Sequence, residues 1–143
     1  MATTHDMIVD RVRSLCSASP FTWAEAVSSE AFTFETTGGS NGGVYRVKAR
    51  GGAVRGGTGY TEERTDSIDI EVLQLVDGDY DATRRALFRA ANSLTAAIIR
   101  DGHEDGGDYA VPDAGRTHDV LGTPGAAYLT LRLTVPVNYE AQV

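Results

Sequence analysis

The stretch AYLTLRLTVPVNY, residues 127–139, alternates apolar and polar side chains almost without interruption. A period of two places successive side chains on opposite faces of a β-strand. We therefore expect a strand with one face in the core and the other wet or touching a partner, as in an antiparallel sheet covered on one side. Pro136 has no backbone N–H, so this end of the strand is expected at a sheet edge or beyond its pairing partner. The apolar face comprises Leu129, Leu131, Leu133, Val135, Val137 and Tyr139.

Other stretches carry the same signal more weakly. Residues 32–35 and 44–50 alternate in the same way, and residues 109–111 and 118–121 are shorter candidates. The alternation in residues 67–76 breaks near its end, which predicts a bulge or a tail buried on both faces. The expected buried faces are Tyr45, Val47 and Ala49 in one strand and Ile68, Ile70 and Val72 in the next.

Two segments show the spacing of amphipathic helices. The first covers residues 6–15, and Thr3 is its expected cap. The second is capped by Asp79 or Asp81 and stopped by Gly102, the residue type favoured just beyond a helix end. The expected buried stripes are Ile8, Val12 and Leu15 in the first helix and Leu87, Ala91, Leu94 and Ile98 in the second.

Glycine marks the expected turns. Residues 38–43 form a loop or hairpin turn, and residues 51–63 contain five glycines and almost nothing apolar, which predicts a long mobile loop. The order of elements predicts an α+β fold over residues 1–143 as a single domain. We expect an antiparallel sheet of about four or five strands, two helices packed on one of its faces, and a long glycine-rich hairpin loop.

Composition narrows the classes of function. A chain of 143 residues with 41% apolar side chains can build a core without disulfides, and Cys16 has no second cysteine to pair with. There is no apolar leader at residues 1–7 and no run long enough to span a bilayer, so we expect a soluble protein made in the cytoplasm. The net charge of −7 argues against sequence-independent binding of DNA, which requires basic side chains that neutralise the phosphates.

Charge is segregated along the chain. Residues 44–57 hold four basic side chains and no acid, whereas residues 61–81 hold eight acids against Arg64 alone. These two segments could face each other within one molecule, face a neighbouring copy, or be two solvated hairpin faces. A run of arginines on the second helix could dock on an acidic neighbour or form a solvated helix face. The candidate subunit-interface residues are therefore Arg46, Lys48, Arg50, Arg55, Glu62, Glu63, Asp66, Arg84, Arg85 and Arg89.

No residue set predicts catalysis, a metal site or a cofactor site. The stretch Gly57-Thr58-Gly59-Tyr60 lacks the third glycine and the following helix of a phosphate loop. The histidines are scattered, without the tight ligand spacing of zinc sites, although a hard cation could use the acidic loops beside His103 and His118. No Gly-x-Ser-x-Gly occurs, and Cys16 is expected to be a buried structural thiol.

The order and lengths of these segments resemble the tail terminator, or tail completion, proteins of long-tailed bacteriophages. Those are small α+β proteins with an N-terminal helix, a strand hairpin with a long glycine-rich loop, a strand leading into an amphipathic helix, and a final alternating strand. The similar segments are residues 6–15, 32–50, 67–76, 80–100 and 127–139.

The resemblance implies a virion structural protein in the neck of the tail. Its copies would form a ring, commonly of six subunits, that caps the tail tube and offers a head-joining surface. The implied partners are copies of itself, the tail tube protein and a head–tail connector or stopper protein, with DNA only passing through the lumen. It implies no enzyme activity, no cofactor and no membrane, with assembly in the host cytoplasm.

Other classes stay open at this point. Another neck or tail component, such as a head–tail connector or a tail tube subunit, has a similar small design. A small-molecule-binding α+β dimer or an enzyme would need a pocket with convergent polar groups. A nucleic-acid-binding module is opposed by the net charge.

Overall fold

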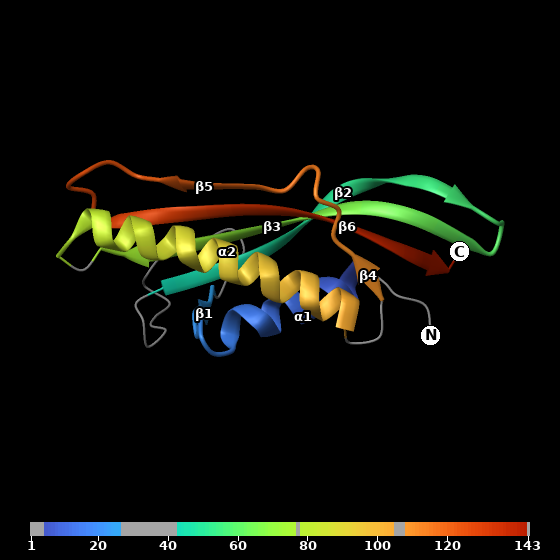
Figure 1. Cartoon of the computed structure of the whole chain (residues 1–143), viewed down its shortest axis with the longest axis horizontal. Coiled ribbons are helices and arrows are strands. Elements are labelled where there is room, and N and C mark those ends of the chain that lie inside the picture. The colour runs from blue at the N-terminus through green and yellow to red at the C-terminus, as the bar shows by residue number, and fades with distance from the viewer. Residues whose placement is uncertain (1–4, 27–42, 77, 105–107, 143) are drawn as a thin grey trace.

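Figure 1 shows the computed structural model of the chain, which describes residues 5–26, 43–76, 78–104 and 108–142. Two helices and six strands occur in these residues, so the expected α+β class is confirmed. The elements are α1 (His5–Ser17), β1 (Ala24–Glu25), β2 (Gly43–Gly57), β3 (Thr61–Leu75), α2 (Tyr80–Glu104), β4 (Tyr109–Ala110), β5 (Thr117–Leu121) and β6 (Tyr128–Gln142).

The described strands form one mixed sheet in the order β1-β2-β3-β6-β4, and β5 also pairs with β6. All pairs are antiparallel except β1 with β2, which is parallel. The expectation of four or five antiparallel strands was therefore wrong in number and in kind. The parallel strand β1 is only two residues long, too short to leave a periodic signal in the sequence.

The expected long loop over residues 51–63 is instead a β-hairpin. Strand β2 continues to Gly57, residues 58–60 make the turn, and β3 begins at Thr61. Two register shifts, between Arg50 and Ala53 and between Val54 and Gly56, interrupt the β2–β3 pairing. These irregularities hide the strand from a period-two search, because a bulge moves each following side chain to the other face. The expected strand at residues 32–35 and the turn at 38–42 lie outside the described residues.

Strand β3 shows no bulge near its end. Every residue of β3, from Thr61 to Leu75, is paired with one of β6, and Leu75 is 45% exposed. The expected bulge or doubly buried tail at this end was therefore wrong. Leu73 and Leu75 alternate with Val72 onto the face of the sheet opposite the helices, which leaves Leu75 exposed.

Pro136 lies inside the sheet and not beyond its pairing partner. It is opposite Ser67 of β3, and β6 continues past it to Gln142. On its other side, β5 pairs with β6 up to Thr134 and β4 pairs from Asn138 onward, so neither strand pairs with Pro136. A proline is tolerated at this position because the missing N–H has no described ladder partner to lose.

Both helices cover the same face of the sheet, as expected (Figure 1). In α1 the buried residues include Val9 and Cys16 besides Ile8 and Val12, whereas Leu15 is only partly buried. The expected cap Thr3 lies outside the described residues. Residues four apart on one helical face reach the core together, so the stripe continues through Cys16 instead of turning toward Leu15.

Helix α2 begins as expected and ends later than expected. The Oδ1 atom of Asp79 accepts hydrogen bonds from the N–H groups of Asp81 at 3.0 Å and Ala82 at 3.2 Å, which makes Asp79 the cap. The helix passes through Gly102 to Glu104, so Gly102 is not the stop. A Cβ at Gly102 would lie 2.6 Å from the carbonyl oxygen of Tyr109, which shows that the missing side chain admits β4.

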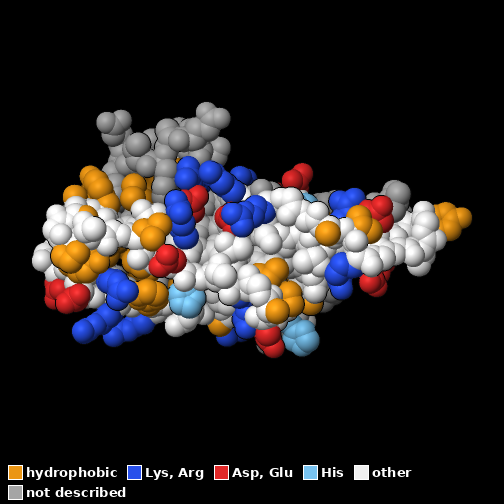
Figure 2. Space-filling model, turned by 90° about the horizontal axis from the view of Figure 1, so that it is seen from above, with side chains coloured by type: hydrophobic (Ala, Val, Ile, Leu, Met, Phe, Trp, Pro, Cys, Tyr) orange, Lys and Arg blue, Asp and Glu red, His pale blue; other side chains and the backbone are white. Residues whose placement is uncertain are grey.

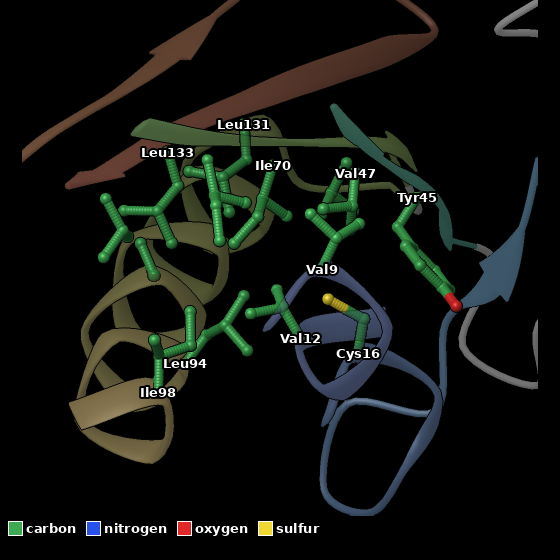
Figure 3. Close-up of a cluster of buried hydrophobic side chains, with 14 of the residues drawn as sticks. Val9, Val12, Cys16, Tyr45, Val47, Ile70, Leu94, Ile98, Leu131 and Leu133 are labelled. Atoms are coloured by element: carbon green, nitrogen blue, oxygen red, sulfur yellow. The ribbon is translucent and has the colours of Figure 1, made fainter. Parts of the chain in front are cut away.

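The core lies between the two helices and the sheet (Figure 3). Burial raises the pKa of the Cys16 thiol to about 12, and the charge of Glu25 adds to that effect. The expected burial of Cys16 is confirmed, and a neutral buried thiol is a poor nucleophile. No helix in the described part of the chain is long and apolar enough to cross a membrane. The core side chains in Figure 3 include Val9, Val12, Cys16, Val47, Ile70, Leu94, Ile98, Leu131 and Leu133.

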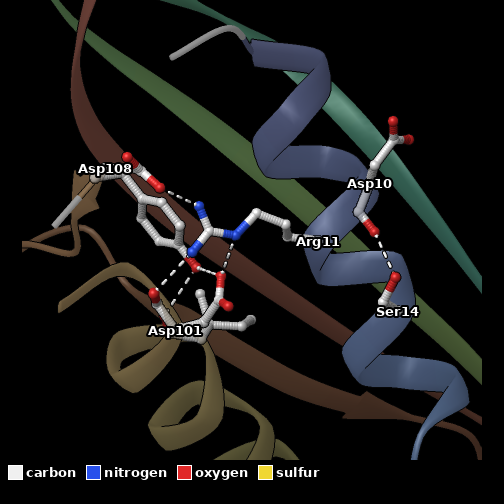
Figure 4. A network of polar contacts seen from close by, with 7 residues as sticks. Asp10, Arg11, Ser14, Asp101 and Asp108 are labelled. Carbon is white, nitrogen blue, oxygen red and sulfur yellow. Dashed lines mark hydrogen bonds and ion pairs between the residues drawn. The ribbon is translucent and has the colours of Figure 1, made fainter. Parts of the chain in front are cut away.

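An arginine fixes α1 to the end of α2 and to β4 (Figure 4). Arg11 contacts Asp101 through Nε at 2.9 Å and Asp108 through Nη1 at 2.7 Å. Its guanidinium also lies 5.4 Å from the ring centre of Tyr109, whose hydroxyl donates to Asp101 at 2.8 Å. These contacts hold Tyr109 against the end of α2, where the absence of a side chain at Gly102 leaves room for its backbone.

Candidate assembly surfaces

The face of the sheet opposite the helices carries a cross-strand ladder of charges. Basic residues of β2 stand opposite acidic residues of β3, and Glu71 is in turn opposite Arg132 of β6. Arg46 contacts Glu71 at 3.0 Å, and Arg50 contacts Asp69 at 3.0 Å. Figure 2 shows basic and acidic side chains lying next to one another on this side of the molecule.

Two of the four expected interface residues of β2, Arg46 and Arg50, therefore form ion pairs within the chain. Of the three possibilities for the two oppositely charged segments, the intramolecular one holds for Arg46 and Arg50. Lys48 is opposite Asp69 and exposed, and it has no ion pair among the described residues. Most charges of the ladder therefore contact one another across neighbouring strands and are not free to bind a partner.

Asp66 was expected at an interface but is buried, with an 8% exposed fraction. Its Oδ2 atom accepts hydrogen bonds from the Tyr139 hydroxyl and from Nδ1 of His5. A Cβ at Gly52 would collide with Oδ1 of Asp66 and with the carbonyl of Thr65, so β2 passes tightly over this cluster. The sequence did hold the signal, because Asp66 stands two residues before Ile68 and so shares its buried face.

The Asp66 cluster offers no exposed reactive group. Burial raises the pKa of Tyr139 to about 12, and its hydrogen bond to Asp66 adds to the rise. The Nε2 atom of His5, which a proton transfer would use, is buried and has no hydrogen-bond partner among the described residues. A general base must reach the proton that it removes, and the buried Nε2 atom does not meet this condition. The hydrogen bonds from His5 and Tyr139 to Asp66 instead join α1 to β3 and β6.

Beyond the Asp66 cluster the sheet extends past the helices as a three-stranded arm (Figure 1). We call residues 51–65 and 138–142 the hairpin arm. Residues 51–55 are all exposed, with Val54 at 57%, and Tyr60 in the turn is 82% exposed. The arm is nevertheless ordered by pairing along both its strand junctions, and Thr65 donates to Oδ1 of Asn138 at 2.7 Å.

The other expected interface residues divide between this arm and α2. Arg55 and Glu63 are exposed on the arm, while Glu62 forms an ion pair with Arg64 at 2.8 Å. Of the three arginines expected on α2, all are exposed, and Arg84 lies over the ring of Phe88 at 4.9 Å. The structure therefore does not bring the predicted residues into one site. Some lie on the ladder, Asp66 is buried, and the others divide between the arm and α2.

Among the described residues, the outer edge of β2 is unpaired over most of its length. Strand β1 pairs with β2 only at Val44 and Tyr45, and no other described strand lies on that edge. An unpaired strand edge presents N–H and C=O groups that can pair with another chain. This edge belongs to the same arm that carries the exposed Tyr60.

The histidines are not gathered around an ion site. His118 packs against the ring of Phe88 at 5.7 Å, and His103 stands in the last turn of α2, about four helical turns away along the same helix. Within residues 5–26, 43–76, 78–104 and 108–142, no three metal-ligating side chains come together. The acidic loop beside His103 falls largely outside that part of the chain.

The sequence matches no family model, and no curated protein matches it. Function must therefore be inferred from the surfaces described above.

Proposed function

We propose that this protein is a virion structural protein, a tail terminator whose copies form a closed ring. The ring, hexameric in this proposal, caps the tail tube and provides the head-joining surface. The observation that carries the proposal is the hairpin arm, an ordered part of the sheet that extends beyond the helices with an exposed aromatic tip. The order of elements that resembles tail terminators supports it.

The arm is suited to contact another subunit. A sheet buries a face to gain stability, and no described helix of the chain covers the exposed face of the arm. Exposed apolar side chains beside an open strand edge mark an interaction surface. The arm lies at one end of the long axis of the molecule. If it binds a different surface of another copy, the contact is heterologous. Repeated heterologous contacts either close into a ring or extend as a filament.

In this proposal the protein acts by binding other proteins and catalyses no reaction. The partners in this proposal are further copies of the chain, the tail tube protein and a head–tail connector or stopper protein. DNA passes through the lumen without being bound, consistent with the net charge of −7.

Light scattering during size exclusion, combined with electron microscopy of the purified protein, tests the proposal. We expect closed rings of uniform size. Open tubes would instead favour a tail tube subunit, because a heterologous contact that does not close continues along an axis. A protein that stays monomeric at high concentration, and also when mixed with a tail tube preparation, would contradict both assignments.

A further inference from the structure

The tip of the hairpin arm joins an apolar side chain to unpaired negative charge. Tyr60 is 82% exposed at the turn. Behind it, Glu63 of β3 stands directly opposite Glu140 of β6, and both are exposed. Like charges directly opposite on a sheet disfavour the pair, and neither carboxylate has an ion pair among the described residues.

An apolar groove lies at the other end of the molecule. It has a volume of about 400 Å³ and lies between the start of α2 and the segment that follows α1. The rings of Phe21 and Trp23, stacked at 5.0 Å between centroids, form one wall, and Ala86 and Leu87 of α2 belong to the other. Among the side chains that line it, only Gln74 and Thr83 are polar, so it suits an aromatic ring better than a polar ligand.

Positive charge stands beside this groove. Arg85 and Arg89 are exposed, and on a helix they neighbour the groove residues Ala82 and Ala86 at a spacing of three. Neither arginine forms an ion pair within the described part of the chain. The groove and its rim therefore match the tip in both properties, apolar against apolar and basic against acidic.

A molecule cannot fill its own groove with its own tip. The groove is lined by Leu75 at the end of β3, and Tyr60 directly precedes the start of that strand at Thr61. The fifteen residues of β3 separate the two by roughly 45 Å. A hairpin tip that fills this groove must therefore belong to another copy of the chain.

We infer that the hairpin tip of one copy docks in the groove of the next copy. Tyr60 enters between the Phe21–Trp23 stack and α2, while Glu63 and Glu140 face Arg85 and Arg89. The contact joins two different surfaces at opposite ends of the molecule, as a head-to-tail ring requires. This inference rests on the proposed function, since it names the contact by which the ring forms.

Cysteine cross-linking tests the contact directly. The double variant Tyr60→Cys with Ala86→Cys should give, on mild oxidation, a ladder of covalent oligomers on a non-reducing gel. Each single variant should give dimers at most, and the native Cys16 is fully buried and should not contribute. A double variant that forms no ladder while its rings persist in the microscope would overturn the docking and leave the proposed function standing.

Charge reversal tests the specificity of the contact. Glu63→Arg combined with Glu140→Arg should raise the concentration needed for half assembly at least tenfold. Adding Arg85→Glu and Arg89→Glu should recover most of that loss, because the pairs are restored with opposite sign. Equal loss in the quadruple variant would overturn the pairing.

Truncation of the tip supplies the matched control. Tyr60→Ala should also weaken assembly at least tenfold, whereas Leu121→Ala, at another exposed apolar position, should not. Circular dichroism should show both variants folded. If Tyr60→Ala assembles as well as the wild type, something else fills the groove and the inference fails. If the wild type itself never assembles, both this inference and the proposed function fail.

Discussion

Two halves of strand β3 have the same hydrogen-bonding neighbours and different surroundings. From Thr61 to Thr65 the strand runs through the hairpin arm, and none of these residues is buried. From Asp66 to Val72 every second residue is buried under the helices. Ladder pairing and a few side-chain contacts, those of the buried Tyr139 and Ala141 among them, maintain the shape of the arm, while a continuous buried stripe stabilises the covered half. Substitutions in the covered half should act on folding, and substitutions in the arm on assembly.

The largest contrast is expected between two aliphatic truncations. Ile70→Ala removes a fully buried side chain and should lower the free energy of unfolding by about 2–5 kcal/mol. Val54→Ala, at a 57% exposed position of the arm, should change it by less than about 0.5 kcal/mol. Urea unfolding followed by the fluorescence of the single tryptophan, Trp23, measures both. Similar losses in the two variants would show that the arm is part of the folding core.

A pair of glycine substitutions sharpens the comparison. Gly102→Ala places a Cβ 2.6 Å from the Tyr109 carbonyl, so we expect a loss of roughly 1–3 kcal/mol despite the better helix propensity of alanine. In Gly56→Ala the new Cβ lies 3.8 Å from Oε2 of Glu63, an ordinary contact, and the change should stay within about 0.5 kcal/mol. Thermal unfolding of the two variants beside the wild type provides the measurement. A stable Gly102→Ala would mean that β4 can shift away from α2.

A buried tyrosine and an exposed one should respond differently to alkali. Burial and then Asp66 raise the pKa of Tyr139 from 10.0 to about 12 in the folded state. The folded state therefore holds this proton more tightly, so the stabilisation is complete below pH 10 and is lost as the pH rises toward 12. Tyr139→Phe should cost about 0.5–1.5 kcal/mol at neutral pH and should lose less stability than the wild type over the alkaline range.

The control for that experiment is Tyr60→Phe, at the 82% exposed tip of the arm. Its unfolding free energy should follow the wild type across the same pH range, including the alkaline loss to which the raised pKa of the buried Cys16 thiol also contributes. If the unfolding free energies of Tyr139→Phe and Tyr60→Phe depend on pH in the same way, burial and Asp66 do not raise the pKa of the Tyr139 hydroxyl.

The covered half was largely predictable from the sequence and the arm was not. Strand β6 and helix α2 bury long regular stripes, and burial of a stripe is what hydrophobic periodicity records. The hairpin part of the arm, residues 51–65, contains no buried residue and has two register shifts, so its glycines favoured the prediction of a loop. Local turn chemistry could not show that residues 51–57 pair with β3, because that pairing depends on the whole sheet.

The charged sites were predictable only in part, for a related reason. Charge segregation between two adjacent segments left three arrangements open, and the structure shows ion pairs of Arg46 and Arg50 across the hairpin. The charge of Asp66 favoured an interface position, although its spacing of two residues from Ile68 places both side chains on the same buried face. The close approach at Gly102 depends on Tyr109 arriving from a later strand, which no local pattern can indicate.

The smallest expected effect on folding separates the two halves most clearly. Glu140→Gln removes one of two like charges that stand directly opposite each other on the arm, so the isolated subunit should gain a few tenths of a kcal/mol. That gain should fade in high salt, because exposed charges are screened. Assembly should nevertheless weaken, since the same carboxylate is proposed to face Arg85 and Arg89 of the next copy.

Unfolding below the assembly concentration and light scattering above it measure the two effects on one variant. The control Glu25→Gln removes a carboxylate that already contacts Arg13 at 3.5 Å, so it should not relieve a like-charge repulsion. If Glu140→Gln destabilised the subunit and left assembly unchanged, its charge would serve the fold. The opposite result would show that the arm keeps an unfavourable charge pair because a neighbouring subunit neutralises it.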